Sequence, residues 1–137
     1  MIPQPVLLDT DTLSAIMRQH PLATKRAQVY LDIHQQFTFS SITRYEILRG
    51  LKAKKATAQL AAFDDFCSKS KILPLTDEMI VKAADIYADL HQRGLLISDA
   101  DILIAATALI HNLTIITNNE NHFKRINSLR VENWLKK

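Results

Sequence analysis

Short runs of apolar residues alternate along the chain with longer segments in which apolar residues recur every three or four positions. The short runs are typical of strands buried on both faces of a sheet, and the longer segments of amphipathic helices. The pattern predicts strands at Val6–Leu8, Phe37–Phe39, Ile72–Leu75, Thr114–Thr117 and Leu129–Val131. It predicts helices at Thr12–Arg18, Pro21–Gln35, Ile42–Lys55, Ala56–Lys69, Thr76–Gly94 and Ser98–His111.

The order of these elements predicts the fold class. Short strands that alternate with helices favour an α/β domain in three layers, in which helices cover both faces of a mainly parallel sheet. We therefore expect a single domain over residues 1–137, with a central sheet of four to five strands flanked by helices. A chain of 137 residues is long enough to bury a real core without metal or disulfide staples.

The apolar positions also predict which helix faces point into the core. In the helix that starts at Ile42, the expected inward residues follow at three-residue steps: Ile42, Tyr45, Leu48 and Leu51. In the helix after Thr76, they are Ile80, Ala83, Ala84, Tyr87 and Leu90. From Ser98 to His111 apolar residues run round the whole helix, so we expect it to be buried on most sides.

Composition excludes several classes of phosphate-binding and metal-binding protein. The only two glycines, Gly50 and Gly94, are too far apart to form a dinucleotide-binding turn or a phosphate loop. The single cysteine, Cys67, cannot form an internal disulfide or a zinc cluster, which suits a reducing cytosol. The net charge of 17 − 14 = +3 tolerates a polyanionic partner but does not demand one.

Polar residues argue against targeting and membrane segments. Asp9 and Asp11 fall where the apolar part of a signal peptide would lie. The apolar stretch from Ile102 ends at Ile110, which is too short to cross a bilayer. We therefore expect a soluble, cytoplasmic protein that does not contact a membrane.

Acidic and amide residues follow most of the predicted strands. Asp9 ends the first strand, Glu46 lies in the helix after the second, and Asp101 lies in the first turn of the buried helix. Asn119 and Glu120 follow the fourth strand. Because the carboxyl ends of parallel strands share one edge of a sheet, these side chains can converge there. Converging carboxylates repel one another, and a hard cation with oxygen ligands, Mg²⁺ or Mn²⁺, keeps them ionised.

Helix capping is an alternative explanation for each acid taken singly. Asp9 could simply cap the next helix. The spacings Thr43-x-x-Glu46 and Ser98-x-x-Asp101 both match a capping box. Capping does not explain why a buried, apolar helix opens with an acid, nor why every predicted strand except the third is followed by polar or acidic residues. A metal site would explain both, and its ion could orient a water and neutralise charge on a phosphate.

Five segments together match one known family in order and spacing. They are Leu7–Asp11, Ser40–Gly50, Asp101–Ala108, Ile116–Asn119 with Phe123 following, and Val131–Trp134. Each segment alone is a weak signal, but the combination is specific. From about Val6 to Trp134, the chain resembles the PIN-domain ribonucleases, and specifically the VapC-type toxins of bacterial toxin–antitoxin pairs.

The resemblance implies an Mg²⁺-dependent endoribonuclease that hydrolyses structured RNA such as tRNA or rRNA. Asp9, Glu46 and Asp101 match the three main acids of the family, which bind metal and carry catalysis. In the implied mechanism Asp9 and Asp101 hold the metal, and Glu46 completes its shell or orients the attacking water. We assign no role to Asp11 or Asp99.

The resemblance also indicates a set of weaker candidates around these acids. The family's fourth acid falls near Asn119, where this chain has an amide, and the adjacent Glu120 could supply a charge. Thr10, Thr117 and Asn119 would bind water or support the acids. His111 and His122 form no recognisable acid–base arrangement, and we interpret both as surface or packing residues.

Basic residues on the helix that carries Glu46 are candidates for RNA binding. Arg44 and Arg49 flank the predicted site closely enough to hold RNA phosphates. Lys52, Lys54 and Lys55 are better explained as a solvated helix face. The resemblance further implies a VapB-like antitoxin whose C-terminal segment lies in an apolar groove of the toxin, a homodimer, and a hetero-oligomer with the antitoxin. Operator DNA would be bound only through the antitoxin.

Three other functions compete with this interpretation. Asp9-x-Asp11 after an apolar strand imitates the nucleophile motif of haloacid-dehalogenase-type phosphatases, in which Asp9 would form an aspartyl-phosphate. Leu13 stands where that motif requires Thr or Val. A receiver-like switch domain would need an aspartate after the third strand, which Ile72–Leu75 does not offer. The third alternative is an inactive PIN module that only binds RNA or antitoxin, because Asn119 replaces the fourth acid.

Overall fold

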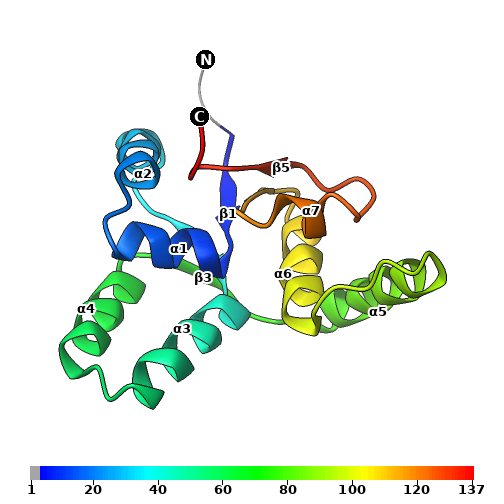
Figure 1. Ribbon diagram of the computed structural model, residues 1–137, viewed down its shortest axis with the longest axis horizontal. Helices are drawn as coiled ribbons and strands as arrows, with labels where there is room; N and C mark the ends of the chain where they lie inside the picture. Colours follow the sequence, from blue (N-terminus) through cyan, green and yellow to red (C-terminus); the bar gives the residue numbers. More distant parts are fainter. Residues whose placement is uncertain (1–3) are drawn as a thin grey trace.

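Five short strands form one parallel sheet in the computed structural model, which describes residues 4–137 (Figure 1). The strands are β1 (Val6–Leu8), β2 (Thr38–Ser40), β3 (Lys71–Leu73), β4 (Thr114–Ile116) and β5 (Val131–Glu132). Their order across the sheet is β3-β2-β1-β4-β5, and every neighbouring pair is parallel. The predicted α/β fold with a mainly parallel sheet is confirmed.

Helices cover both faces of this sheet. In the described residues they are α1 (Thr10–Met17), α2 (Pro21–His34), α3 (Ser41–Ala53), α4 (Thr57–Ser68), α5 (Asp77–Gln92), α6 (Asp99–Ile110) and α7 (Glu120–Phe123). Figure 1 shows α1 to α4 on one side of β1, and α5 and α6 on the other. No helix within residues 4–137 is long and apolar enough to cross a membrane.

Alternation along the strands divides the core into two layers. Val6 and Leu8 of β1 pack with α1 to α4 and with the C-terminal Trp134. Leu7, which points to the opposite face, packs with α5 and α6. Because both faces of the central strand are covered, its residues are all apolar, and the continuous run identifies it in the sequence.

Side-chain caps start five of the described helices at defined residues. The caps are Asp9, His20, Ser40, Thr76 and Ser98, and each accepts a hydrogen bond from the backbone N–H three residues further on. The expectation that Asp9 can cap the next helix is confirmed, whereas the predicted Thr43 capping box is wrong. Asp9 starts α1 at Thr10, earlier than predicted, and Ser40 rather than Thr43 caps α3. Glu46 is thus not part of a capping box, because it lies more than one turn inside its helix.

The remaining boundaries differ from the prediction by small shifts. β2 and β5 end one residue later than predicted, while β3 ends at Leu73, so that Pro74 lies outside the strand. The short helix α7 was not predicted, because four residues are too few to show a helical repeat.

Two predicted helix faces are only partly confirmed. In α3, Ile42, Leu48 and Leu51 pack against the core as predicted, but Tyr45 is 58% exposed, and the fully buried residues are Thr43 and Ile47. A three-residue step drifts by about 60° per step around a helix of 3.6 residues per turn, so residues at that spacing do not stay on one face. In α5 the buried residues are Met79, Ala83, Ile86 and Leu90, which leaves Ile80, Ala84 and Tyr87 exposed. The prediction that α6 is buried on most sides is confirmed.

Phe63 provides a test of this packing, because it is the fully buried residue through which α4 joins the core of its layer. We expect Phe63→Ala to lower the free energy of unfolding by about 3–5 kcal/mol, since it leaves a cavity in a close-packed core. The matched control is Val81→Ala on the 56% exposed surface of α5, which should change stability by less than about 0.5 kcal/mol. Urea denaturation of both variants measures the difference, and equal losses would contradict the described core.

Candidate active site

The strand order reverses between β1 and β4, and this point holds the first candidate acid. β2 and β3 lie on one side of β1, and β4 and β5 on the other. Leu8 pairs with Ile116, so Asp9 and Thr117 follow directly on neighbouring strands. In open parallel sheets, ligands bind in the crevice outside the strand ends at such a switch point. The fold therefore places Asp9 where a functional site is expected.

The Asp9 carboxylate is buried with little compensation for its charge. Its side chain is 4% exposed. Its Oδ1 accepts a hydrogen bond of 2.8 Å from the backbone N–H of Thr12, and the Thr117 hydroxyl also bonds to the carboxylate. Burial dominates over these bonds and raises the pKa of Asp9 to about 7. Asp9 is thus both the cap of α1 and a desolvated acid, so the capping explanation does not exclude the functional one.

Glu46 reaches this edge of the sheet from α3. The Thr10 hydroxyl donates a hydrogen bond of 2.6 Å to Glu46 Oε1, and it also lies 3.2 Å from the Thr43 hydroxyl. Glu46 Oε2 lies 3.6 Å from a terminal nitrogen of Arg49. Thr10 follows Asp9 directly, so this hydrogen bond ties the second acid to the first.

Asp101 lies in the first turn of α6, and its neighbours include a residue that sequence reasoning dismissed. Burial raises the pKa of Asp101, and the negative charge of Glu46 raises it further. The nearby imidazole of His122 acts in the opposite direction, and its Nδ1 lies 3.7 Å from Asp101 Oδ2. The interpretation of His122 as a surface or packing residue is therefore wrong. Its contact depends on α7, which no sequence pattern indicated.

Asn119 connects the end of β4 to this histidine. Its backbone N–H donates a hydrogen bond of 2.8 Å to the Thr117 hydroxyl, and its side-chain Nδ2 lies 2.6 Å from His122 Nδ1. Asn119, Thr117 and His122 therefore form a polar chain between the surroundings of Asp9 and those of Asp101. The position of the family's fourth acid is occupied here by an amide that is paired with an imidazole.

Glu120 faces a different part of the molecule. Lys136 lies 2.7 Å from its carboxylate, Asn133 donates to it at 3.0 Å, and Lys124 lies at 3.4 Å. The hydrogen bond from Lys136 is the main reason that the pKa of Glu120 falls to about 2. These contacts hold the C-terminal segment against α7, so the structure gives Glu120 a structural role and no contact with the other acids.

The two predicted RNA-binding arginines differ in their surroundings. Arg44 forms a hydrogen bond with Cys67 of α4, which joins α3 to α4. Arg49 is paired with Glu46 and lies over the ring of Tyr45, with its guanidinium carbon 5.1 Å from the ring centroid. Arg49 is therefore in contact with the candidate acid Glu46, whereas Arg44 contacts α4.

The donor set and the charge balance both fit a hard cation. The three acids offer only oxygen ligands. Among residues 4–137, no lysine or arginine forms an ion pair with Asp9 or Asp101. No three His, Cys, Asp or Glu side chains in this part of the chain form a ready-made metal cluster. Each acid is held by its own partners, so a cation would have to bring the three carboxylates closer together than they are in this structure.

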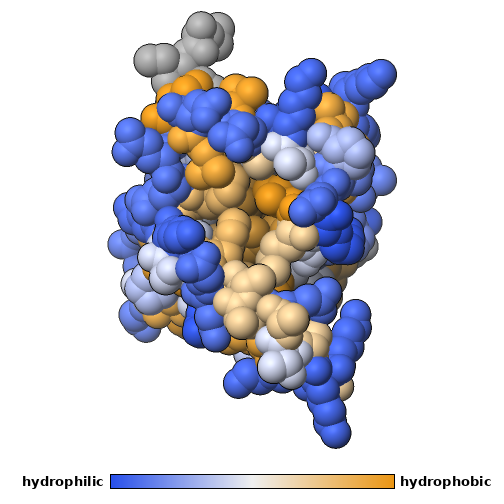
Figure 2. Space-filling model, turned by 90° about the vertical axis from the view of Figure 1, so that its left-hand side faces the viewer, coloured by the Kyte–Doolittle hydropathy of each residue, from blue (hydrophilic) through white to orange (hydrophobic). Residues whose placement is uncertain are grey.

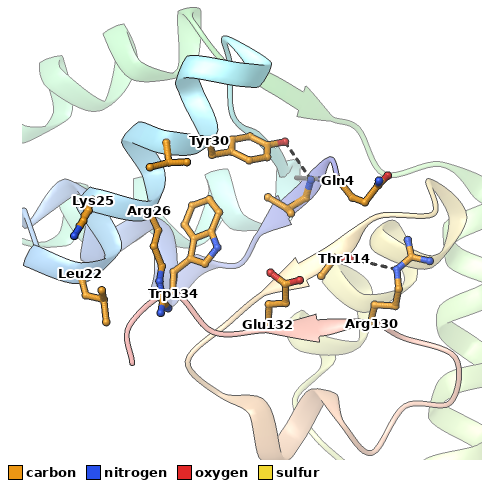
Figure 3. A pocket seen from close by; sticks show the side chains of 11 residues that line it. Gln4, Leu22, Lys25, Arg26, Tyr30, Thr114, Arg130, Glu132 and Trp134 are labelled. Carbon is orange, nitrogen blue, oxygen red and sulfur yellow. Dashed lines mark hydrogen bonds between the residues drawn. The ribbon is translucent and has the colours of Figure 1, made fainter. Parts of the chain in front are cut away.

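A pocket of about 710 Å³ lies elsewhere, and it contains none of the predicted site residues (Figure 3). Val6 and Thr114 line it at the amino ends of β1 and β4, together with Tyr30 of α2 and the C-terminal Trp134. The acids lie at the carboxyl ends of the same strands. The pocket and the acid cluster are therefore at opposite edges of the sheet.

The comparisons with known proteins identify the family. A model of the PIN domain matches residues 6–129. Ribonuclease VapC2 of Rickettsia felis is 32% identical over 129 residues, which cover 93% of this chain and 96% of that protein. The tRNA(fMet)-specific endonuclease VapC of Salmonella typhimurium is 29% identical, with coverage of 93% and 96%. The chain therefore belongs to the PIN-domain family, among its VapC-type ribonucleases.

Solved structures agree with this assignment. VapBC2 from Rickettsia felis, bound to a DNA fragment from its promoter, has a chain that matches with a TM-score of 0.85 and 30% identity. DNA-bound VapBC from Salmonella typhimurium matches with a TM-score of 0.85 and 27% identity. Each match covers 96% of this chain and 99% of the other. The predicted family and ribonuclease class are confirmed by these relatives, and nucleases of the PIN family generally depend on divalent metals.

The burial of Asp9 predicts how stability depends on pH in the metal-free protein. The pKa of Asp9 rises from 3.8 to about 7 on folding, so the folded state favours the neutral carboxyl. The contribution of this carboxyl to the free energy of unfolding is fully present below the unfolded pKa, and it is lost as the pH rises through the folded pKa. Asp9→Asn keeps a capping oxygen but carries no charge. In EDTA at about pH 8 it should therefore be more stable than the wild type, by at most about 4 kcal/mol.

This advantage should shrink as the pH falls and vanish below the unfolded pKa of 3.8, where Asp9 is protonated in both states. Chemical denaturation of both proteins across this pH range measures it. The exposed Asp11→Asn is the matched control, because Asp11 lies two residues away without burial. A wild type that is as stable as Asp9→Asn at every pH would show that Asp9 is not desolvated as described.

Proposed function

We propose that the protein is an Mg²⁺-dependent endoribonuclease, the toxin of a toxin–antitoxin pair, and that Asp9, Glu46 and Asp101 are its catalytic and metal-binding residues. Mn²⁺ could substitute, because it accepts the same oxygen ligands. The observation that carries the proposal is the buried Asp9 at the β1/β4 switch point, linked through Thr10 to Glu46 and without a basic ion-pair partner among the described residues. The similarity to VapC ribonucleases supports the same reaction.

Asp9 and Asp101 are the residues that would hold the ion, and Glu46 would complete the set or orient the attacking water. When bound, the ion supplies the charge that neutralises the scissile phosphate and lowers the pKa of a water. Thr117 would keep Asp9 in place through its hydroxyl, and Thr10 would do so for Glu46. Both threonines act by orienting an acid.

Asn119 and His122 would take over the orienting role of the family's fourth acid. They form a polar pair beside Asp101 that can orient its carboxylate. An acid in their place would add a further negative charge beside Glu46 and Asp101. The ion pairs of Glu120 with Lys136 and Lys124 argue against a direct role for Glu120 in metal binding.

RNA would approach along α3, where Arg49 lies beside Glu46 and, with Arg44 of the same helix, can pair with phosphates. Structured RNA such as tRNA or rRNA is the proposed substrate class, and a VapC relative from Salmonella typhimurium is named a tRNA(fMet)-specific endonuclease. We propose that this activity takes place in the cytoplasm and that residues 1–137 form one domain. The lone cysteine suits a reducing compartment.

A VapB-like antitoxin is the proposed partner, in a hetero-oligomer with a toxin homodimer. Figure 2 shows apolar side chains around a hollow on the side of the molecule where α2 and α4 lie. Helices α1, α3 and α4 contribute partly buried apolar residues to this side, among them Ile16, Leu48, Leu51 and Phe66. Such a surface suits an amphipathic segment of a partner. Similar chains crystallised as VapBC complexes bound to DNA, and operator DNA would be bound here through the antitoxin.

The proposal predicts that Asp9→Asn and Asp101→Asn each remain folded and lose RNA cleavage by more than about 100-fold, because each removes a charged ligand for the ion. Asp99→Asn is the matched control, since Asp99 is an exposed acid in the same turn as Asp101. Cleavage of tRNA and rRNA is measured with Mg²⁺ and again with EDTA.

Cleavage that persists in EDTA, or in either of the two site variants, would overturn the assignment. RNA binding without cleavage by the wild type would instead support the inactive PIN module. Transfer of phosphate to Asp9 would support the phosphatase alternative, although the buried carboxylate and the family assignment both argue against it.

A further inference from the structure

One turn of α3 exposes an aromatic ring beside the candidate site. Tyr45 precedes Glu46 in the sequence, and its side chain is 58% exposed although it is large and apolar over most of its surface. The exposed Tyr45 ring, next to a proposed catalytic acid, is not stabilised by burial in the core. Its position therefore suggests a contact with something outside the chain.

Arg49 joins this ring to the acid. It lies four residues after Tyr45 and three after Glu46, so its side chain neighbours each of theirs on the helix surface. Its guanidinium is 5.1 Å from the centre of the Tyr45 ring and 3.6 Å from Glu46 Oε2. Since Thr10 holds the other oxygen of Glu46 at 2.6 Å, the ring and the arginine are fixed relative to the end of β1.

The charge around Tyr45 selects among possible partners. Within α3, Arg44, Arg49 and Lys52 outweigh the single acid Glu46, which gives 3 − 1 = +2, and Lys54 and Lys55 follow the helix. A second copy of the chain would bring the same positive charge against this face. A strand of RNA brings negative phosphates together with planar bases, and both features match the pair of an exposed ring and a guanidinium.

We propose that Tyr45 and Arg49 form a stacking site for one base of single-stranded RNA, next to the phosphate that is cleaved at the acids. This inference rests on the proposed function, since it names a contact of the same site with its substrate. The face of the Tyr45 ring stacks on the base, and Arg49 donates to an adjacent phosphate. Because every base has a flat face, the site raises affinity for unpaired RNA without selecting a sequence.

The chain contains a matched control for this pair. Tyr87 of α5 is 45% exposed and stacks on His91, which lies four residues later, with ring centroids 5.9 Å apart. Like Tyr45, Tyr87 is an exposed tyrosine whose ring contacts a side chain four residues later, but it lies on a helix of the opposite layer. Its removal changes exposed aromatic surface without changing the proposed site.

The experiment compares binding of a fluorescently labelled, single-stranded RNA decamer to the wild type, Tyr45→Ala, Tyr45→Leu, Tyr45→Phe and Tyr87→Ala in EDTA, which prevents cleavage. Stacking of a base on an aromatic ring contributes about 1–3 kcal/mol, so Tyr45→Ala and Tyr45→Leu should weaken binding about 5- to 150-fold. Tyr45→Phe keeps the ring and should bind like the wild type, as should Tyr87→Ala. Thermal melting checks that all variants are folded.

Unchanged binding by Tyr45→Leu would overturn the stacking site, and so would an equal loss in Tyr87→Ala. A Tyr45 variant that binds RNA normally but shifts from dimer to monomer in sedimentation would assign the ring to a protein contact instead. Mg²⁺-dependent cleavage by the wild type is measured in parallel. Cleavage with normal binding by Tyr45→Leu refutes only the stacking site, whereas no cleavage by the wild type refutes the proposed nuclease.

Discussion

The parallel pairing of β1 with β4 is the constraint on which the candidate site depends. The register of Leu8 with Ile116 brings Asp9 beside Thr117, and the Asp9 backbone N–H donates to the Ile116 carbonyl at 3.0 Å. The same pairing buries the Asp9 side chain between the sheet and the start of α1. Without this register, Asp9 would be an ordinary exposed cap with an ordinary pKa.

Charge compensation separates Asp9 and Asp101 from the structural acid Glu120. Glu120 lies between Lys136 and Lys124 and gains a low pKa from them, whereas burial raises the pKa of Asp9 and Asp101. A protein that keeps desolvated acids without basic partners carries an energetic cost unless a cation binds. If Asp9, Glu46 and Asp101 bind a metal, the other 11 acids face 17 basic residues. The rest of the chain then carries a net charge of 17 − 11 = +6, which suits contact with RNA.

Much of the fold and the main acids could be predicted from the sequence, because their signals are local. The runs at Val6–Leu8 and Thr114–Ile116 are apolar since both faces of these strands are covered, and caps such as Ser98 mark where helices begin. His122 could not be predicted, since its contact with Asp101 is made by a turn of four residues between β4 and β5. The outward position of Tyr45 depends on which side of α3 meets the sheet, and that is decided by tertiary packing.

The central claim is that Asp9, Glu46 and Asp101 together bind a divalent cation, and crystals of the purified protein soaked in Mn²⁺ test it most directly. Mn²⁺ prefers the same oxygen ligands as Mg²⁺ and scatters anomalously. The account predicts an anomalous peak bonded to carboxylate oxygens of Asp9 and Asp101, with Glu46 coordinated directly or through water, and no such peak in Asp101→Asn. A peak only at other residues, or none in a well-ordered site, would contradict it.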